Sequence, residues 1–370
     1  MHVTRILHVT TYLQGGAGRN IADLAIAQHR AGLDVLVVAD AGGESGYRSY
    51  PEYVDELRAA GVPLARVHST FKRDAALNTR AATALHRLTD GWRPHLVHAH
   101  ATTPAVVARL ARLGSAPVLN TMHGWGIAKT ADQKASDIAV LESANAVVVP
   151  SVAAARTLNE AGLSRDDVHV IPYGLPVDTP SAAPDVKDAQ KLSGLARGRR
   201  LCFCIGTIGA RKNQQLLVDA LATEALHDVI AVFIGDGETA PLQAHAREMR
   251  VADRVVIVGH RPRASRYLPL ADAVVLPSRN EGLPLVVLES LRAAVPVVGS
   301  DVPEIAEALD GGRCGYLFRS EDARSLATAL RAALAAPADV RARFRARFED
   351  HYSASRMFGA YARLYERLGS

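Results

Sequence analysis

The strongest constraint on the fold is an alternation of strand-like and helix-like segments that runs twice along the chain. Short apolar, β-branched runs alternate with Ala-, Leu- and Arg-rich segments of helical period. Continuous apolar strands separated by helices predict a parallel sheet that is covered by helices on both faces. The first set of strand candidates spans residues 5–10, 34–40, 63–68, 95–100, 117–123, 146–151 and 168–174.

The alternation restarts after residues 174–200, which are rich in Pro, Gly, Ser and charge and predict a linker followed by a helix. The second set of strand candidates spans 200–208, 229–237, 254–260, 273–278, 296–301 and 315–320. A chain of 370 residues is long for a single core. We therefore predict two Rossmann-like, doubly wound α/β domains that face each other across a cleft.

The composition is that of an ordinary globular protein, with 48% hydrophobic and 22% charged residues. No apolar run is long enough to span a bilayer, and the first residues lack a signal-peptide pattern. The three cysteines, Cys202, Cys204 and Cys314, have no second pair at metal-ligand spacing, so core thiols in a reducing compartment are expected. These features predict a cytoplasmic protein.

The net charge of +5 is unevenly distributed. Between residues 58 and 93 lie Asp74, Asp90 and an excess of basic residues: Arg58, Arg66, Lys72, Arg73, Arg80, Arg87 and Arg93. Such a patch favours peripheral contact with an anionic lipid surface or an acidic acceptor, although a solvated helix face explains it equally well. The aromatic residues of this segment are Phe71 and Trp92, too few to interleave with the basic residues as single-strand binding needs, so a nucleic-acid partner is not expected.

Two glycine motifs test whether the chain binds a dinucleotide. "GDGETA", residues 235–240, follows a strand and matches G-x-G-x-x-A, but no acidic residue ends the next strand to hold a ribose. "QGGAGRNI" has Ile21 where the third glycine belongs, counting from Gly16. No G-x-x-x-x-G-K-[ST] sequence occurs. Neither nicotinamide chemistry nor a phosphate-loop nucleotidase is favoured.

"PSRNEGLPLVVLES", residues 277–290, contains two carboxylates in an otherwise apolar run, Glu281 and Glu289. A buried carboxylate is costly unless it is paired. Pro284 fits the first position of a helix, so the backbone N–H groups of 282–285 predict an open helix N-terminus, which attracts anions. The alternative is a structural role, in which Glu281 favours the helix dipole and Glu289 pairs with Arg292.

Residues at three other predicted strand ends also suit the binding of an anionic ligand. Arg211 and Lys212 follow the strand at 200–208 and suit a diphosphate. Gly16 lies in a predicted glycine loop, "TTYLQGGAGRN", after the first strand, and His123 ends the fifth strand. Ligands of such sheets bind at the carboxyl ends of the strands, so these loops together predict an anion-binding site.

With these motifs, the chain resembles family 4 of the retaining glycosyltransferases of GT-B fold over nearly its whole length. Glu281 and Glu289 meet the family's E-x7-E signature, with matching flanks "YLPLADAVVLPS" and "AAVPVVGSDVPEIAE". "FEDHYSASRMFGAYARLYERL" is similar to the family's last helix, which crosses back onto the first domain. The resemblance implies an acceptor domain, 1–175 with a crossing helix at about 352–370, and a nucleotide-sugar donor domain, 176–351.

The resemblance also implies roles for residues of the donor domain. Glu289 would bond the nucleotide ribose, and Glu281 would lie against the donor sugar and its phosphates. Lys212 would stabilise the leaving diphosphate. Backbone near Arg261 would hold the base, and the rest of the phosphate site would come from the backbone of Gly282, Leu283 and Pro284.

In the first domain, the resemblance implies that Gly16 approaches the phosphates and that His123 lies beside the transferred sugar and the acceptor. The chain departs from the family pattern at one position. The family usually has arginine directly after the glycine that Gly206 matches, and here that residue is Thr207. We expect Arg211 to supply the missing positive charge.

The implied reaction moves a sugar from a nucleoside diphosphate, UDP or GDP, to an acceptor hydroxyl with retention at the anomeric carbon. No metal site and no cofactor are expected, since no D-x-D motif occurs. The acceptor classes are a glycan, a lipid-linked acceptor and a small molecule, with bacterial surface glycan or glycolipid synthesis as the expected role. The alternatives are a sugar-nucleotide epimerase of the same fold and a catalytically silent binding subunit. The expected specificity loops, residues 42–50 and 124–136, match no sequence pattern that identifies the transferred sugar.

Overall fold

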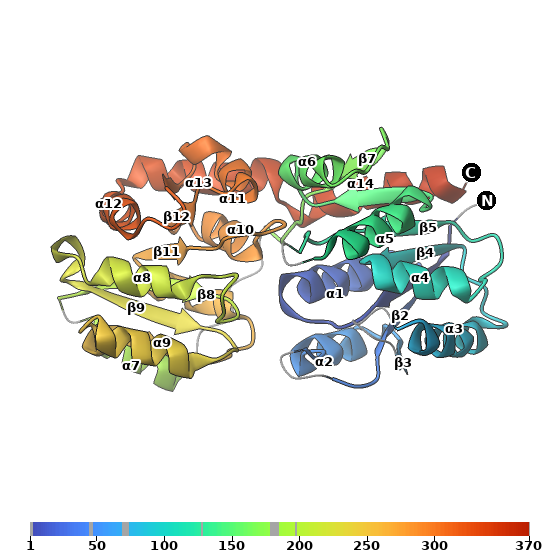
Figure 1. Cartoon of the computed structure of the whole chain (residues 1–370), viewed down its shortest axis with the longest axis horizontal. Helices are drawn as coiled ribbons and strands as arrows, with labels where there is room; N and C mark the ends of the chain where they lie inside the picture. The colour runs from blue at the N-terminus through green and yellow to red at the C-terminus, as the bar shows by residue number, and fades with distance from the viewer. Residues whose placement is uncertain are drawn as a thin grey trace. The chain divides into compact units, whose positions relative to one another are not determined.

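A computed structural model describes residues 3–43, 47–68, 74–126, 129–177, 185–196 and 198–369. The chain divides into two compact units (Figure 1). Unit 1 comprises Met1–Gly174 and Ser355–Ser370, and unit 2 comprises Leu175–Ala354. Each unit contains one parallel sheet with helices, as the alternating pattern predicts.

The sheet of unit 1 has seven parallel strands in the order β3-β2-β1-β4-β5-β6-β7. All seven strand candidates of the first half are confirmed, although most end earlier than predicted because their last residues turn into loops. The strands are β1 (Arg5–Thr10), β2 (Asp34–Asp40), β3 (Leu64–Val67), β4 (Leu96–His100), β5 (Val118–Thr121), β6 (Ala146–Val149) and β7 (Val168–Val170).

Helices cover both faces of this sheet, because alternate residues of β1 pack into different cores. Leu7 and Val9 pack with Leu85 of α3, whereas Ile6 packs with Leu24 of α1 and with the C-terminal helix α14. The helices are α1 (Gly15–Arg30), α2 (Pro51–Ala59), α3 (Ala75–Thr89), α4 (Thr102–Leu110), α5 (Ala131–Glu142), α6 (Val152–Glu160) and α14 (Ala354–Gly369). The end of the chain therefore completes the core of the first unit.

The sheet of unit 2 has six parallel strands in the order β10-β9-β8-β11-β12-β13. They are β8 (Arg200–Ile205), β9 (Val229–Ile234), β10 (Val255–Ile257), β11 (Ala273–Leu276), β12 (Val297–Ser300) and β13 (Tyr316–Phe318), which confirms all six candidates. The helices include α7 (Val186–Leu195), α8 (Gln214–Leu221), α9 (Thr239–Glu248), α10 (Leu285–Arg292), α11 (Pro303–Ala308), α12 (Ala323–Leu334) and α13 (Ala338–His351). Short 3-10 helices are η1 (Glu224–Leu226), η2 (Ala252–Arg254), η3 (Ala264–Leu270) and η4 (Asp310–Gly312).

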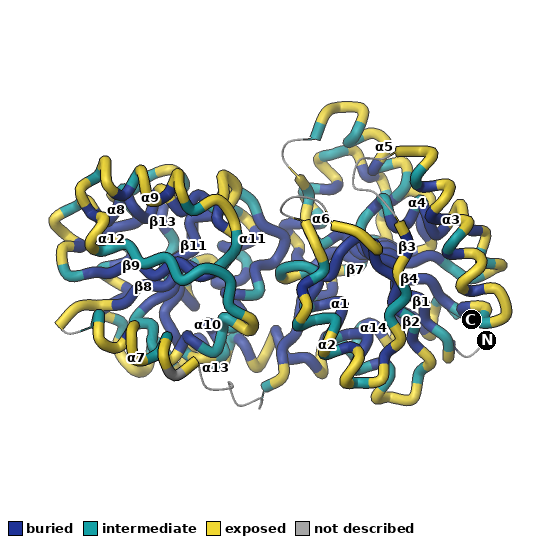
Figure 2. Tube along the Cα trace, turned by 90° about the horizontal axis from the view of Figure 1, so that it is seen from below, coloured by how far each residue is buried: buried dark blue, intermediate teal, exposed yellow. Residues whose placement is uncertain are grey.

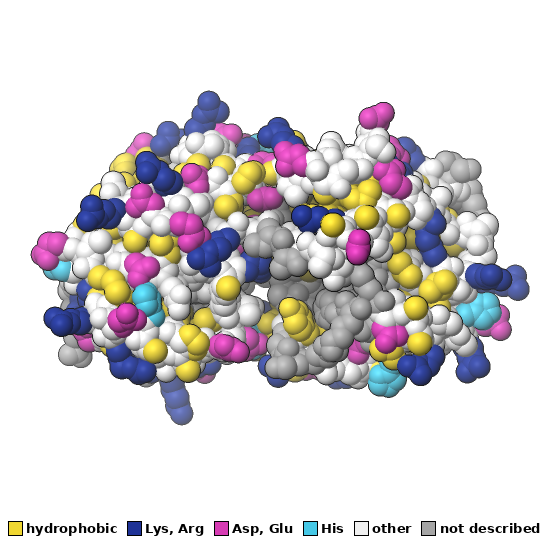
Figure 3. Space-filling model, in the orientation of Figure 1, with side chains coloured by type: hydrophobic (Ala, Val, Ile, Leu, Met, Phe, Trp, Pro, Cys, Tyr) yellow, Lys and Arg dark blue, Asp and Glu magenta, His cyan; other side chains and the backbone are white. Residues whose placement is uncertain are grey.

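Buried residues fill the middle of each unit, and exposed ones lie on the outer turns (Figure 2). On the face drawn in Figure 3, lysine and arginine side chains are interspersed with acidic ones over both units. None of the helices among the described residues is both long and apolar enough to cross a membrane.

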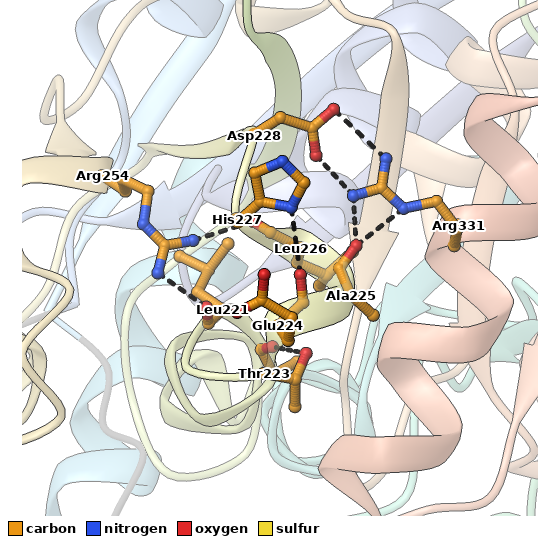
Figure 4. A network of polar contacts seen from close by, with 10 residues as sticks. Leu221, Thr223, Glu224, Ala225, Leu226, His227, Asp228, Arg254 and Arg331 are labelled. Atoms are coloured by element: carbon orange, nitrogen blue, oxygen red, sulfur yellow. Dashed lines mark hydrogen bonds and ion pairs between the residues drawn. The ribbon is translucent and has the colours of Figure 1, made fainter.

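Two arginines fix the connection between α8 and β9 in unit 2 (Figure 4). Arg254 donates to the carbonyl oxygens of Leu221 and Leu226, each at 2.8 Å. Arg331 of α12 bonds the Asp228 carboxylate. Carbonyl groups at the end of a helix lack partners within that helix, so these contacts satisfy them. This network is structural and stabilises the packing of α8 and α12 against the sheet.

Two local expectations were wrong by a small margin. The run "QGGAGRN" does not form a loop throughout, because α1 begins at Gly15 and includes Gly16. The connection after β1 is therefore only Thr11–Gln14. Pro284 is the N-cap of α10 rather than its first helical residue, with extended backbone angles of φ −75° and ψ 115°. The helix begins at Leu285.

Candidate functional site

Glu281 lies in the connection between β11 and α10 and is paired with both predicted cations. Its side chain is 7% exposed. The Lys212 ammonium bonds one carboxylate oxygen at 2.6 Å, and Arg211 bonds the other at 3.1 Å. Burial acts to raise the pKa of Glu281, but the adjacent charges of Lys212 and Arg211 outweigh it and lower the pKa. The carboxylate is therefore ionised and carries a buried ion pair.

Glycines bring the loop that carries Lys212 close to the neighbouring strand. A Cβ on Gly235, after β9, would lie 2.0 Å from the carbonyl oxygen of Gly206, after β8. Gly206 in turn has φ +145°, and a Cβ there would lie 3.4 Å from the Lys212 side chain. The glycines of "GDG" thus allow two backbones to approach closely. This packing role accounts for the presence of a motif that resembles a dinucleotide-binding signature.

A second ion pair, between Arg279 and Glu321, also fixes the loop that carries Lys212. Arg279 donates to Glu321 at 2.7 Å and to the carbonyl of Ala210 at 2.6 Å, and its own N–H donates to the carbonyl of Arg211. Asn213, in a left-handed conformation with φ 53°, also donates to Glu321 at 3.2 Å. The connections after β8 and β11 are therefore held together, which fixes Lys212 against Glu281.

Helix α10 begins directly after these connections. Its N-cap, Pro284, has no polar side-chain atom with which to cap the first turn. Gly282, Leu283 and Pro284 are buried beside Glu281. Glu289 is half-buried in the second turn of the helix. A helix N-terminus next to two cations is a suitable environment for an anion.

Arg261 follows β10 and is held by a residue of the linker helix. Its guanidinium bonds the Asp188 carboxylate of α7 at 2.5 Å, and the Tyr267 hydroxyl bonds the same carboxylate at 3.0 Å. The hydrogen bond from Arg261 lowers the pKa of Asp188. The side chain of Arg261 is thereby fixed beside the backbone that was predicted to hold a base.

In unit 1, Gly16 is exposed in the first turn of α1, whose N-cap Gln14 makes no side-chain capping bond. The closest backbone approach in this region occurs at Gly18, where a Cβ would lie 2.4 Å from the carbonyl carbon of Leu13. Gly16 thus lies in a helix N-terminus, as an anion-binding role needs, although the surrounding loop is shorter than predicted.

His123 follows β5 and is fully hydrogen-bonded. Its Nδ1 lies 2.7 Å from the Tyr173 hydroxyl and its Nε2 lies 3.1 Å from Nδ1 of His100. Burial lowers the pKa of His123 to about 4, so the ring is neutral near pH 7. The histidine partners were not identified from the sequence, although the alternating histidines of "HLVHAH" were a visible signal.

Glu304, at the start of α11, is another residue that sequence reasoning missed. It is 4% exposed. Burial raises its pKa, and the negative charge of Glu281 raises it further. A carboxyl group close to Glu281 favours its own protonated form, which can donate a hydrogen bond that an ionised carboxylate cannot.

Two family models match the chain, one in each half. Residues 15–174 match a model described as a glycosyl transferase 4-like domain, and residues 199–336 match the model of the glycosyl transferases group 1. The matched ranges contain Gly16 and His123 in the first half, and the pair Lys212 and Glu281 in the second.

Among relatives, the glycosyltransferase TuaC of Bacillus subtilis (strain 168), named for teichuronic acid biosynthesis, is 29% identical over 248 residues, which span 64% of this chain and 60% of that protein. Phosphatidyl-myo-inositol mannosyltransferase of Mycobacterium leprae (strain TN) is 26% identical over 348 residues, 90% of this chain and 87% of that protein.

Among solved structures, HepE of Anabaena in complex with UDP and glucose matches with a TM-score of 0.82 at 17% identity, covering 98% of this chain and 99% of that chain. The two parallel-sheet units and this likeness confirm the predicted GT-B fold. Together with the family models and the relatives, they identify the chain as a glycosyltransferase of GT-B fold.

Proposed function

We propose that this enzyme transfers a sugar from a nucleoside diphosphate to an acceptor hydroxyl, with retention at the anomeric carbon. The observation that carries the proposal is the pairing of Glu281 with Lys212 and Arg211 beside the start of α10. Two cations and one carboxylate leave one net positive charge at the carboxyl ends of β8 and β11. An anionic leaving group fits that charge.

The proposed chemistry is stabilisation of the departing diphosphate. Negative charge develops on the phosphates as the bond to the sugar breaks, and groups already fixed in place stabilise it without reorganisation. Lys212 acts as a point charge. Arg211 supplies the second positive charge, which the family's usual arginine would carry at the position of Thr207. Because side chains and the helix terminus carry this task, we propose that no divalent metal is required.

The proposal gives the two glutamates of the E-x7-E spacing different tasks. Glu281 orients the two cations and lies against the donor sugar, whereas Glu289 bonds the nucleotide ribose. Backbone of Gly282, Leu283 and Pro284 contacts the donor, and backbone near Arg261 holds the base. Gly16 and His123 act on the phosphates and on the sugar and acceptor, respectively.

The donor is proposed to be UDP- or GDP-linked, and the acceptor a lipid-linked or surface glycan. HepE is solved with UDP and glucose, which supports a uridine nucleotide. The names of the two relatives, one for teichuronic acid biosynthesis and one for phosphatidyl-myo-inositol mannosylation, support a cell-envelope acceptor.

A panel of UDP-, GDP- and ADP-sugars tests the donor site. We expect one nucleotide to raise the melting temperature of the wild-type enzyme selectively, because ligands stabilise the folded state that binds them. Glu289→Ala should lose most of that shift, since the ribose hydroxyls lose their acceptor. Glu366→Ala, on the surface of α14, is the matched control for loss of a helical glutamate.

Running the panel once with chelating agent and once with added magnesium tests the metal-free proposal at the same time. A selective shift in the wild type that survives chelation and is lost in Glu289→Ala supports the site. Equal binding by Glu289→Ala would make this glutamate structural, and a shift that needed added magnesium would contradict the metal-free mechanism.

Peripheral membrane contact through residues 58–93 is also proposed. Arg58, Arg66, Arg80, Arg87 and Arg93 are exposed on unit 1, while Lys72 and Arg73 lie outside the described residues. We expect flotation with vesicles that contain anionic lipid, lost in high salt and weakened by Arg80→Gln with Arg87→Gln on α3. Equal flotation with neutral vesicles, or none with anionic ones, would contradict this contact.

A further inference from the structure

Unit 1 contains a cluster of buried histidines to which the proposed function assigns no task. His8 of β1 and His98 of β4 are fully buried, and His100 at the end of β4 is 3% exposed. The parallel register places His8 beside His98 and Thr10 beside His100. All three face the side of the sheet that α1 and α14 cover, since Ile6 and Leu96 on the same faces pack with those helices.

Hydrogen bonds join these rings to His123 in one continuous series, named here the imidazole relay. The Tyr173 hydroxyl lies 2.7 Å from Nδ1 of His123, and Nε2 of His123 lies 3.1 Å from Nδ1 of His100. Nε2 of His100 lies 2.9 Å from Nδ1 of His8. Nε2 of His8 lies 2.7 Å from Oε1 of Gln28 in α1.

Every ring of the relay is neutral. Burial lowers the pKa of His8 and of His123 to about 4, and lowers that of His100 well below its ordinary value. A neutral imidazole has one N–H donor and one acceptor nitrogen. The protonation of one ring therefore dictates that of the next.

Gln28 sets the direction, because its carbonyl oxygen can only accept. His8 must donate from Nε2, which leaves its Nδ1 as an acceptor for the Nε2–H of His100. Nδ1 of His100 then accepts from the Nε2–H of His123. Nδ1 of His123 is therefore unprotonated and accepts from the hydroxyl of Tyr173.

A branch on the other side of Gln28 holds the orientation of its amide. The amide nitrogen donates to the Tyr365 hydroxyl of α14 at 3.0 Å. That hydroxyl then donates to Nδ1 of His98 at 2.8 Å, and Nε2 of His98 donates to Thr121 at 2.7 Å. If the Gln28 amide had the opposite orientation, its oxygen would face Tyr365. The Tyr365 hydroxyl and the ring of His98 would then both have to exchange their donor and acceptor roles.

We propose that the imidazole relay holds His123 as its Nε2–H tautomer, so that Nδ1 is a hydrogen-bond acceptor for a substrate hydroxyl. In the structure this nitrogen accepts from the hydroxyl of Tyr173, a residue that is 3% exposed, and a substrate hydroxyl would replace that hydroxyl during turnover. His100, His8 and Gln28 are positioning residues that act through His123. This inference rests on the proposed role of His123 beside the sugar and the acceptor.

A metal ion is a competing explanation, because ligand atoms of His8, His98 and His100 lie within 4.8 Å of one another. The geometry favours hydrogen bonds. The two nitrogens of His98 already meet Tyr365 and Thr121. His8 and His100 approach to 2.9 Å, whereas two nitrogens on one tetrahedral zinc lie roughly 3.3 Å apart when each bond is about 2.0 Å.

The test is nitrogen-15 NMR of histidine side chains in the full chain, with signals assigned through His→Gln variants. In the wild type we expect His123 to show a protonated Nε2 and an unprotonated Nδ1. Gln28→Leu removes the last acceptor and should give His123 a mixture of tautomers. kcat should fall on the order of tenfold, with KM for the donor unchanged.

Tyr361→Phe is the matched control. It removes a buried hydroxyl that lies 3.3 Å from Thr121, beyond the relay, and should leave the His123 signals unchanged. Melting temperatures of all variants separate a tautomer effect from general loosening of unit 1.

Three outcomes would overturn the relay: a protonated Nδ1 on His123 in the wild type, a single tautomer retained in Gln28→Leu, or one bound metal ion per chain by elemental analysis. A tautomer that responds to Gln28→Leu while kcat does not would keep the relay and remove His123 from the transfer step. Because the NMR signals need no turnover, failure of the proposed function would be seen separately, in the donor panel.

Discussion

Replacing Lys212 by methionine should lower kcat for sugar transfer by about 10²- to 10³-fold, the range for losing one preorganised electrostatic partner of a transition state. Methionine keeps most of the length of the side chain and removes only the charge that would stabilise the departing diphosphate. Steady-state rates at saturating donor measure this effect. Arg211 remains in the variant, so some stabilisation of the leaving group persists.

The same change should lower the free energy of unfolding by about 3 kcal/mol, because it leaves a buried carboxylate without its main partner. Glu281 would keep only Arg211, whose side chain is 51% exposed and so screened by water. The pKa of Glu281 should rise as a result. Chemical denaturation at pH 7 measures the change in stability.

A double variant separates stability from catalysis. Adding Glu281→Gln to Lys212→Met removes the uncompensated charge, so most of the lost stability should return while kcat stays low. Arg211→Met, which removes an exposed cation, should cost less stability than Lys212→Met. Near wild-type kcat in Lys212→Met would contradict the assignment of this lysine to the leaving group.

The sequence was sufficient for the architecture because strand and helix periodicity are local properties. Every strand candidate was confirmed, and the C-terminal helix begins at Ala354, within two residues of the prediction. The errors fell at element ends. Strand 117–123 was predicted to run to His123, but β5 ends at Thr121, since hydrophobicity does not mark where pairing to a neighbouring strand stops.

Pairings between distant residues could not be derived in the same way. Glu281 was recognised as a carboxylate that needs partners, and Lys212 was assigned to a phosphate. Their direct contact joins residues that are far apart in sequence. The relay likewise depends on the β1–β4 register, which brings His8 within hydrogen-bond distance of His100, and its branch depends on the return of α14 to unit 1. Neither the register nor the return of α14 can be derived from local sequence patterns.

Gly235→Ala should destabilise the enzyme by about 3 kcal/mol, at the upper end of the usual cost of overpacking. The new Cβ would lie 2.0 Å from the carbonyl oxygen of Gly206, so backbone, not a flexible side chain, must move. The N–H of Gly235 also donates to the carbonyl of Gly259 at 3.0 Å, which resists movement in the other direction. Thermal and chemical unfolding measure the loss.

Donor binding should weaken in the same variant, because Gly206 begins the loop that positions Lys212 against Glu281. We expect Kd for the nucleotide to rise several-fold, measured by calorimetry at a temperature where the variant is folded. Gly209→Ala is the matched control in that loop: no atom lies within 4 Å of its added Cβ, and its stability should stay within about 0.5 kcal/mol of wild type. Equal stability of the two variants would show that β8 and β9 can separate without cost. The close approach of Gly206 and Gly235 would then have no part in fixing Lys212.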